Sequence, residues 1–117
     1  MGKEIQQQVA LNLLSEGTAI EGDLHAKNDI RVDGNIKGKI NTTGRLVIGP
    51  TAKVEGEINS PSVDILGIVQ GNILSPGTVS LRSKSTFVGT IKAAYIMIES
   101  GAIFNGECTI EREVHQK

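Results

Sequence analysis

The sequence is poor in aromatic and sulfur-containing side chains: Trp is absent, and the 117 residues include one Tyr, two Phe and one Cys. So few rings argue against stacking on nucleic-acid bases or sugars as a main activity. The lone cysteine, Cys108, forms no disulfide within the chain, so a cytoplasmic protein is the default expectation. Twelve basic and 13 acidic residues give a net charge of −1, and the basic excess of electrostatic nucleic-acid binders is missing too.

Long apolar runs are also missing. No run reaches the roughly 18 residues that a membrane-spanning helix needs, and the first residues show no signal-peptide pattern. The apolar residues that are present are mainly 15 Ile, 9 Val and 8 Leu. This mixture favours β-strands over helices.

A five-residue pattern, apolar-x-Gly-x-apolar, occurs six times at separations of 15 to 18 residues. A small residue stands two positions before each copy, and all copies but the first follow an apolar-x-apolar pair. Three patterns in phase indicate a repeat architecture. The motif glycines are Gly22, Gly38, Gly56, Gly71, Gly89 and Gly106.

The period of about 17 residues suits one coil of a β-solenoid, with three short strands around a narrow core. The sequence therefore predicts an all-β fold, a single solenoid of about six rungs over residues 15–110. We expect residues 1–14 to be a flexible N-terminal tail and 111–117 a polar C-terminal tail. Each motif glycine shares the parity of its apolar neighbours, so we expect it at an inward bend with positive φ or no room for a side chain.

Three stretches of the chain carry a resemblance to a known family: GTAIEGDL (17–24), VIGPTAKVEGEI (47–58) and IESGAIFNGECTIE (98–111). They resemble the bactofilins, and the likeness extends over roughly residues 14–111. It implies a right-handed, three-faced β-helix that polymerises end to end, without nucleotide, into non-polar filaments. It also implies a place in the bacterial cytoskeleton, as a scaffold for cell-envelope or morphogenetic proteins, in many members at the cytoplasmic face of the inner membrane.

The ends of a solenoid expose unpaired strand edges, which favours polymerisation. We expect the chain itself to be its own partner through these ends, with Phe104 as the main contact. The alternative is that Phe104 fills a wider last core layer, and both roles can hold in part. The expected interface residues are Thr18, Ile20 and Leu24 in the first rung and Ile96, Ile98, Ile103, Phe104 and Cys108 in the last.

The segment 1–14 has three interpretations: a flexible tail or loose cap over the first rung, a weak anchor at the membrane surface, or a partner-binding peptide. The anchor would be an amphipathic helical turn or two. Its membrane-contacting residues would be Ile5, Val9, Leu11, Leu13 and Leu14.

Enzymatic chemistry has little support. The apolar steps are not those of a hexapeptide acyltransferase, and the two histidines, His25 and His115, are too few for a typical zinc site. We expect surface positions for both and a small buried hydrophobic role for Cys108. The sequence thus predicts a non-enzymatic subunit with no catalytic residue, cofactor, metal, nucleic acid or small-molecule substrate. The alternative is a monomeric solenoid that serves as a protein-binding scaffold.

Overall fold

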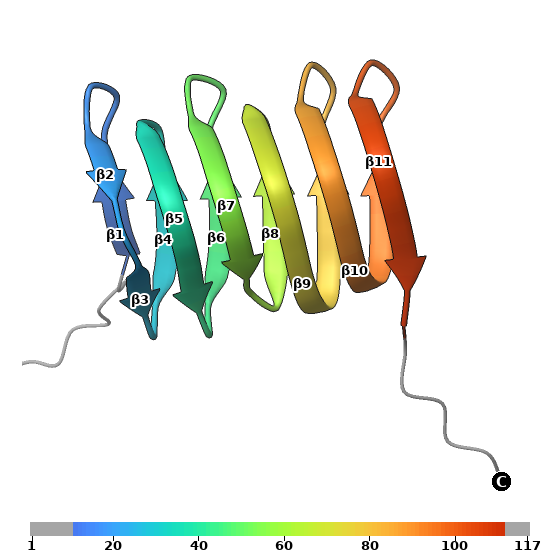
Figure 1. Cartoon of the computed structure of the whole chain (residues 1–117), viewed down its shortest axis with the longest axis horizontal. Coiled ribbons are helices and arrows are strands. Elements are labelled where there is room, and N and C mark those ends of the chain that lie inside the picture. Colours follow the sequence, from blue (N-terminus) through green and yellow to red (C-terminus); the bar gives the residue numbers. More distant parts are fainter. Residues whose placement is uncertain (1–10, 112–117) are drawn as a thin grey trace, which may run out of the picture.

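The computed structural model describes residues 11–111, and every regular element in that range is a β-strand. The strands stand side by side in a row, so the chain winds along one axis from its first strand to its last (Figure 1). In chain order they are β1 (Leu11–Leu14), β2 (Ala19–Glu21), β3 (Leu24–Ala26), β4 (Asp29–Val32), β5 (Asn35–Thr42), β6 (Arg45–Ile48), β7 (Lys53–Asn59), β8 (Ser62–Ile65), β9 (Ile68–Leu81), β10 (Thr86–Ile98) and β11 (Ile103–Ile110).

Every strand pairs in parallel with the strand at the same place one turn earlier or later. The register brings equal motif positions together, so Ile36 lies beside Val54 and Gly38 beside Gly56. The prediction of a β-solenoid with rungs about 17 residues apart is therefore confirmed. The leading apolar position shows the six rungs as one stack: Ile20, Ile36, Val54, Val69, Phe87 and Phe104.

Each rung has three straight segments, which we name faces A, B and C. Figure 1 shows β5 and β7 in front of β4 and β6, with the core between the two layers. Face A precedes the motif glycine and comprises residues 19–21, 35–37, 53–55, 68–70, 86–88 and 103–105. Face B follows the glycine and comprises residues 24–26, 40–42, 58–60, 73–75, 91–93 and 108–110. Face C comprises residues 11–14, 29–32, 45–48, 62–65, 78–81 and 95–98.

The core is a thin column of aliphatic side chains enclosed by the three faces. In β5, Ile36 and Ile40 are buried while Lys37 and Lys39 are exposed, which is the alternation of a half-buried strand. Phe87 is the largest of the fully buried side chains. Because a rung is one strand thick, each rung covers its apolar side chains only by stacking on its neighbours.

The motif glycines are required by the stacking itself. Gly38 and Gly56 have φ values of +144° and +138°, which L side chains rarely adopt. A Cβ on Gly56 would also collide with the carbonyl oxygen of Gly38 in the preceding rung. The expectation that these glycines have no room for a side chain is confirmed, because the backbone of the preceding rung occupies that space. At Gly22 the φ is +126° but the Cβ position is open.

Tight turns lead from face C to face A wherever the repeat is two residues longer. The amide of Ser85 donates to the carbonyl of Arg82, and the amide of Ala102 donates to that of Glu99. In these two turns the residue before the donor has positive φ: +73° at Lys84 and +95° at Gly101. In the described part of the chain, Lys84 alone has positive φ without being glycine.

The expectation that the solenoid begins at residue 15 is wrong for residues 11–14. They form β1, which pairs in parallel with β4 on face C, so they are neither tail nor helix. Asn12 takes the position above Ile30, and its Nδ2 donates to the carbonyl of Asp29 at 3.2 Å. Leu14 lies beside Val32 and packs against the core.

Candidate assembly surfaces

The C-terminal end of the described solenoid is an open strand edge. β11 pairs only with β10 among the described strands, so one side of its backbone has no strand beside it. Phe104 in β11 stacks on Phe87 with the ring centroids 5.6 Å apart. Phe87 is fully buried, whereas Phe104 is only partly buried. The last rung thus presents one side of an aromatic ring at the end of the rod.

Other apolar side chains of the last rung are uncovered in the same way. Ile98 is 47% exposed although Leu81, its partner one rung earlier, is fully buried. Ile110 is 48% exposed above buried Ala93 and completes this end layer, although it was not among the predicted interface residues. Ile96 remains partly buried. Ile110 lies two residues after Cys108 and therefore points to the same side of the strand. This alternation could have placed Ile110 among the predicted interface residues.

Cys108 lies above Ile91 in the expected column, but it is exposed because no described rung follows it. The prediction of a buried cysteine is therefore wrong for the single chain. The packing beneath the thiol still disfavours the thiolate and raises the pKa of Cys108 above its ordinary value. We assign this thiol no catalytic role.

Ile103 occupies a different place from the other predicted interface residues. It pairs with Thr86, which in turn pairs with Ile68, in the outward column of face A, and it is 59% exposed. Its parity is opposite to that of Phe104, so it belongs to the flank of the rod. It lies next to the end layer without being part of its apolar centre.

The N-terminal end is open as well. β2 and β3 pair only with β5, and β1 only with β4, among the described strands. Ile20 and Leu24 are partly buried and pack against the core from this end. Thr18 is half-buried in the turn before β2, and its carbonyl accepts the amide of Asn35. The structure thus places all three predicted first-rung residues in one layer.

Acidic residues outnumber basic ones at both ends, where Lys27 is the one Lys or Arg of the first rung over residues 11–28. The last rung carries Glu99, Glu107 and Glu111 and no Lys or Arg over residues 95–111. The rung below supplies the cations, with Arg82 3.1 Å from Glu99 and Lys92 3.9 Å from Glu111. The first rung has its own acidic residues, Glu16, Glu21 and Asp23. Attraction between ends must therefore come from apolar contact and backbone pairing.

The residues predicted to touch a membrane divide into three groups. Leu11 and Leu13 are 47% and 60% exposed on β1, while Leu14 packs into the core and is unavailable to a membrane. Ile5 and Val9 lie outside the described residues. Within residues 11–111, no helix is long and apolar enough to cross a membrane.

A shallow groove of about 1350 Å³ follows the corner between faces B and C. Its lining includes Asn41, Asn59, Leu74, Lys92 and Tyr95, a mixture of polar and apolar side chains. The described residues contain no group of three His, Cys, Asp or Glu that could hold a metal ion.

These features define a repeat protein with a continuous core and two end layers that no described strand covers. A family profile described as "Bactofilin: Polymer-forming cytoskeletal" matches residues 12–109. The chain therefore belongs to the bactofilin family, and its class is that of polymer-forming cytoskeletal proteins.

Individual relatives agree with this assignment. The chain is 32% identical over 103 residues to bactofilin BacO of Myxococcus xanthus (strain DK1622), which covers 88% of this chain and 82% of that protein. It is 30% identical over 87 residues to bactofilin BacP of the same organism, covering 74% of this chain and 36% of that protein. A cryo-EM reconstruction of Thermus thermophilus bactofilin double helical filaments matches with a TM-score of 0.79 at 31% identity, covering 86% of this chain and 99% of that chain.

Proposed function

We propose that this chain is a filament subunit that polymerises end to end without nucleotide and scaffolds other proteins of the cell envelope. The observation that carries the proposal is the pair of open end layers. At one end Phe104, Ile98 and Ile110 are uncovered, and at the other Ile20 and Leu24 lie at the surface of the first rung. Stacking two chains covers both layers and continues the backbone ladder of the sheet.

The driving force for this contact is local to the ends. Burial of apolar surface contributes about 25 cal/mol per Å² before the cost of association, and the newly paired backbone groups add to it. Assembly by these contacts consumes no nucleotide. The carboxylates at both ends oppose stacking weakly, because their repulsion is screened over roughly 8–10 Å at ordinary ionic strength.

The wider setting of the filament follows from the family. Self-association is the family's property, and the Thermus thermophilus relative forms double helical filaments. We propose the same assembly here, in the cytoplasm, with cell-shape or envelope proteins recruited to the filament. Contact with the inner membrane would involve Leu11 and Leu13, the exposed predicted residues.

The experiment is sedimentation and negative-stain electron microscopy of the purified chain in the presence of EDTA, with no nucleotide added. We expect filaments whose amount rises steeply above a threshold protein concentration. A monomer at every concentration, shown by light scattering after size exclusion, would contradict the proposal and favour the monomeric scaffold.

Membrane contact has a separate test. Filaments are co-sedimented with liposomes, using the wild-type chain and a Leu11→Glu/Leu13→Glu variant. Reduced co-sedimentation of the variant supports contact through β1, while unchanged co-sedimentation removes these two residues from the proposal.

A further inference from the structure

One side of the solenoid loses all its charge over the last three rungs. The outward positions of face A are the first and third residues of each segment, and in the early rungs they include Glu21, Lys37, Lys53 and Glu55. From the fourth rung onward none of them is charged. These six residues, which we call the uncharged patch, are Ile68, Gln70, Thr86, Val88, Ile103 and Asn105.

The uncharged patch is both apolar and stiff. Ile68 and Val88 are each 40% exposed, and Ile103 is 59% exposed. Their β-branched side chains have few rotamers, so little side-chain entropy is lost when a partner covers them. Over the same rungs, each of the other two faces has one charged residue, Lys92 on face B and Asp64 on face C.

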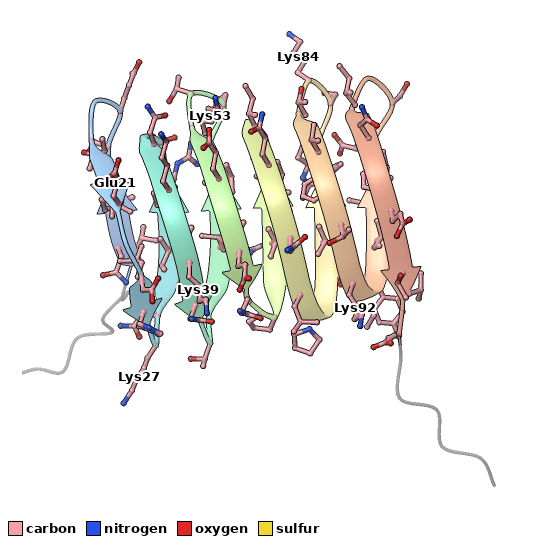
Figure 2. All side chains as sticks on the ribbon, viewed as in Figure 1. Glu21, Lys27, Lys39, Lys53, Lys84 and Lys92 are labelled. Atoms are coloured by element: carbon pink, nitrogen blue, oxygen red, sulfur yellow. The ribbon has the colours of Figure 1, made fainter. Side chains whose placement is uncertain are left out.

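We propose that the uncharged patch is the lateral contact between two filaments of this chain. The inference rests on the proposed end-to-end polymerisation and names the surface through which two such polymers associate. The occupant of the patch is thus a second copy of the same chain. Figure 2 shows the side chains along the rod and labels charged residues in both halves, with Glu21 and Lys53 in the first half and Lys84 and Lys92 in the second.

The size of the patch supports this occupant. Three strands about 4.8 Å apart and a few residues along each strand give roughly 14 Å by 10 Å, or about 150 Å². A stable pair of single proteins needs about 800 Å² on each partner, so the patch is too small to join two monomers. Filaments add one patch for every subunit, and each contact raises the effective concentration for the next.

The regular spacing of the patches along a filament also favours a second filament of this chain as the partner. A second filament of this chain has the same spacing between patches, so the contacts stay in step along the two polymers. The patch is continuous with the end layer, because Ile103 and Asn105 flank Phe104 in β11. Subunits joined at this end therefore bring their patches close together along the filament.

The test compares the wild-type chain with Val88→Lys and Met97→Lys by cryo-electron microscopy and sedimentation. Val88 and Met97 have similar exposures of 40% and 42% and lie in the same strand, but Met97 is on face C. We expect paired filaments for the wild type and Met97→Lys, and single filaments of undiminished length for Val88→Lys. A double variant, Ile68→Thr/Val88→Thr, keeps β-branched residues and should reduce the paired fraction severalfold with an unchanged melting temperature.

Several outcomes overturn the proposal. Pairing that survives in both patch variants rejects the surface, as does an equal loss in Met97→Lys. Wild-type filaments that are always single reject lateral association but leave end-to-end polymerisation intact, whereas no filaments at all reject both. Single filaments that bind phosphatidylglycerol/phosphatidylethanolamine vesicles only when Val88 is present assign the patch to a membrane instead.

Discussion

The ring of Phe104 lies parallel to the ring of Phe87, with their planes inclined by 7° and their centroids 5.6 Å apart. The two residues have the same place in successive rungs, yet only Phe87 is fully buried. Phe87 therefore shows what one further layer does to a ring at this position. The exposed side of the Phe104 ring is apolar surface that a second chain would bury on stacking.

Replacement of Phe104 by Arg is expected to give folded monomers. The guanidinium stays solvated at the end of a single chain, but covering it with another chain costs several kcal/mol for the unpaired charge. Size exclusion with light scattering measures the assembly, and circular dichroism measures the fold. Phe104→Leu, which keeps an apolar side chain, should still polymerise, and long filaments from Phe104→Arg would contradict the assignment.

The glycine stack predicts a difference between two identical substitutions. Gly56→Ala meets both an unfavourable φ and the carbonyl of Gly38, whereas Gly22→Ala meets only the unfavourable φ. Backbone strain of this kind costs about 1–2 kcal/mol, and we expect Gly56→Ala to lose about 2 kcal/mol more because a neighbouring rung must shift.

Urea unfolding in the monomeric Phe104→Arg background measures these differences without the effect of assembly on stability. An equal loss for both glycine variants would mean that the contact between rungs is unimportant.

Lys84→Gly is expected to raise the free energy of unfolding. Lys84 has φ of +73° in a turn where Gly101, one rung later, has +95°. Relief of left-handed strain contributes about 1–2 kcal/mol, and the greater freedom of glycine in the unfolded chain offsets about half of it. Lys84→Ala removes the charge but keeps the strain, so a gain in both variants would point to charge instead.

Glu99 should make the stability of the monomer sensitive to acid. Its carboxylate accepts a 2.8 Å hydrogen bond from the amide of Ser83 and a 3.1 Å bond from the Arg82 guanidinium. The Ser83 bond first, and then Arg82, lower the pKa of Glu99 below its ordinary 4.5. A folded-state pKa below the unfolded one adds stability above the unfolded pKa, and this stability is lost as pH falls through the folded pKa.

Glu99→Gln removes this dependence. We expect its melting temperature to be lower than that of the parent at neutral pH and to fall less between neutral pH and about pH 3. The effect is small because the group is exposed to solvent. The Phe104→Arg background again serves as the parent, and parallel pH profiles of parent and variant would reject a role for Glu99.

The repeat was predictable because the apolar-x-Gly-x-apolar pattern occurs six times in the sequence. Glycines that follow the same column fix the register to the residue, as the pairing of Gly38 with Gly56 shows. The structure agrees with this register, because Lys39 and Glu57 in adjacent rungs carry opposite charges and lie 3.7 Å apart. The fold therefore follows from periodicity without any single decisive residue.

The ends were harder to predict because a side chain in an end layer is not buried by a further rung and so need not be apolar. β1 has Asn12 where the later rungs have Ile, Leu or Val, since no described rung covers that position. Burial at the last rung depends on a neighbour that one chain does not supply, so the column of Cys108 was predictable but its exposure was not. Ile103 was misplaced because apolar identity was weighed above parity.

Alkylation of Cys108 gives the most direct measurement of end-to-end stacking, because it is the chain's sole cysteine and lies in the last rung. Its reaction rate with a maleimide is followed across the concentration threshold for filaments, with Phe104→Arg as the monomeric reference. The account predicts a rate that falls at least tenfold as filaments form and stays high in the variant. Equal rates in filaments and monomers would show that the last rung remains uncovered and would contradict assembly through the ends.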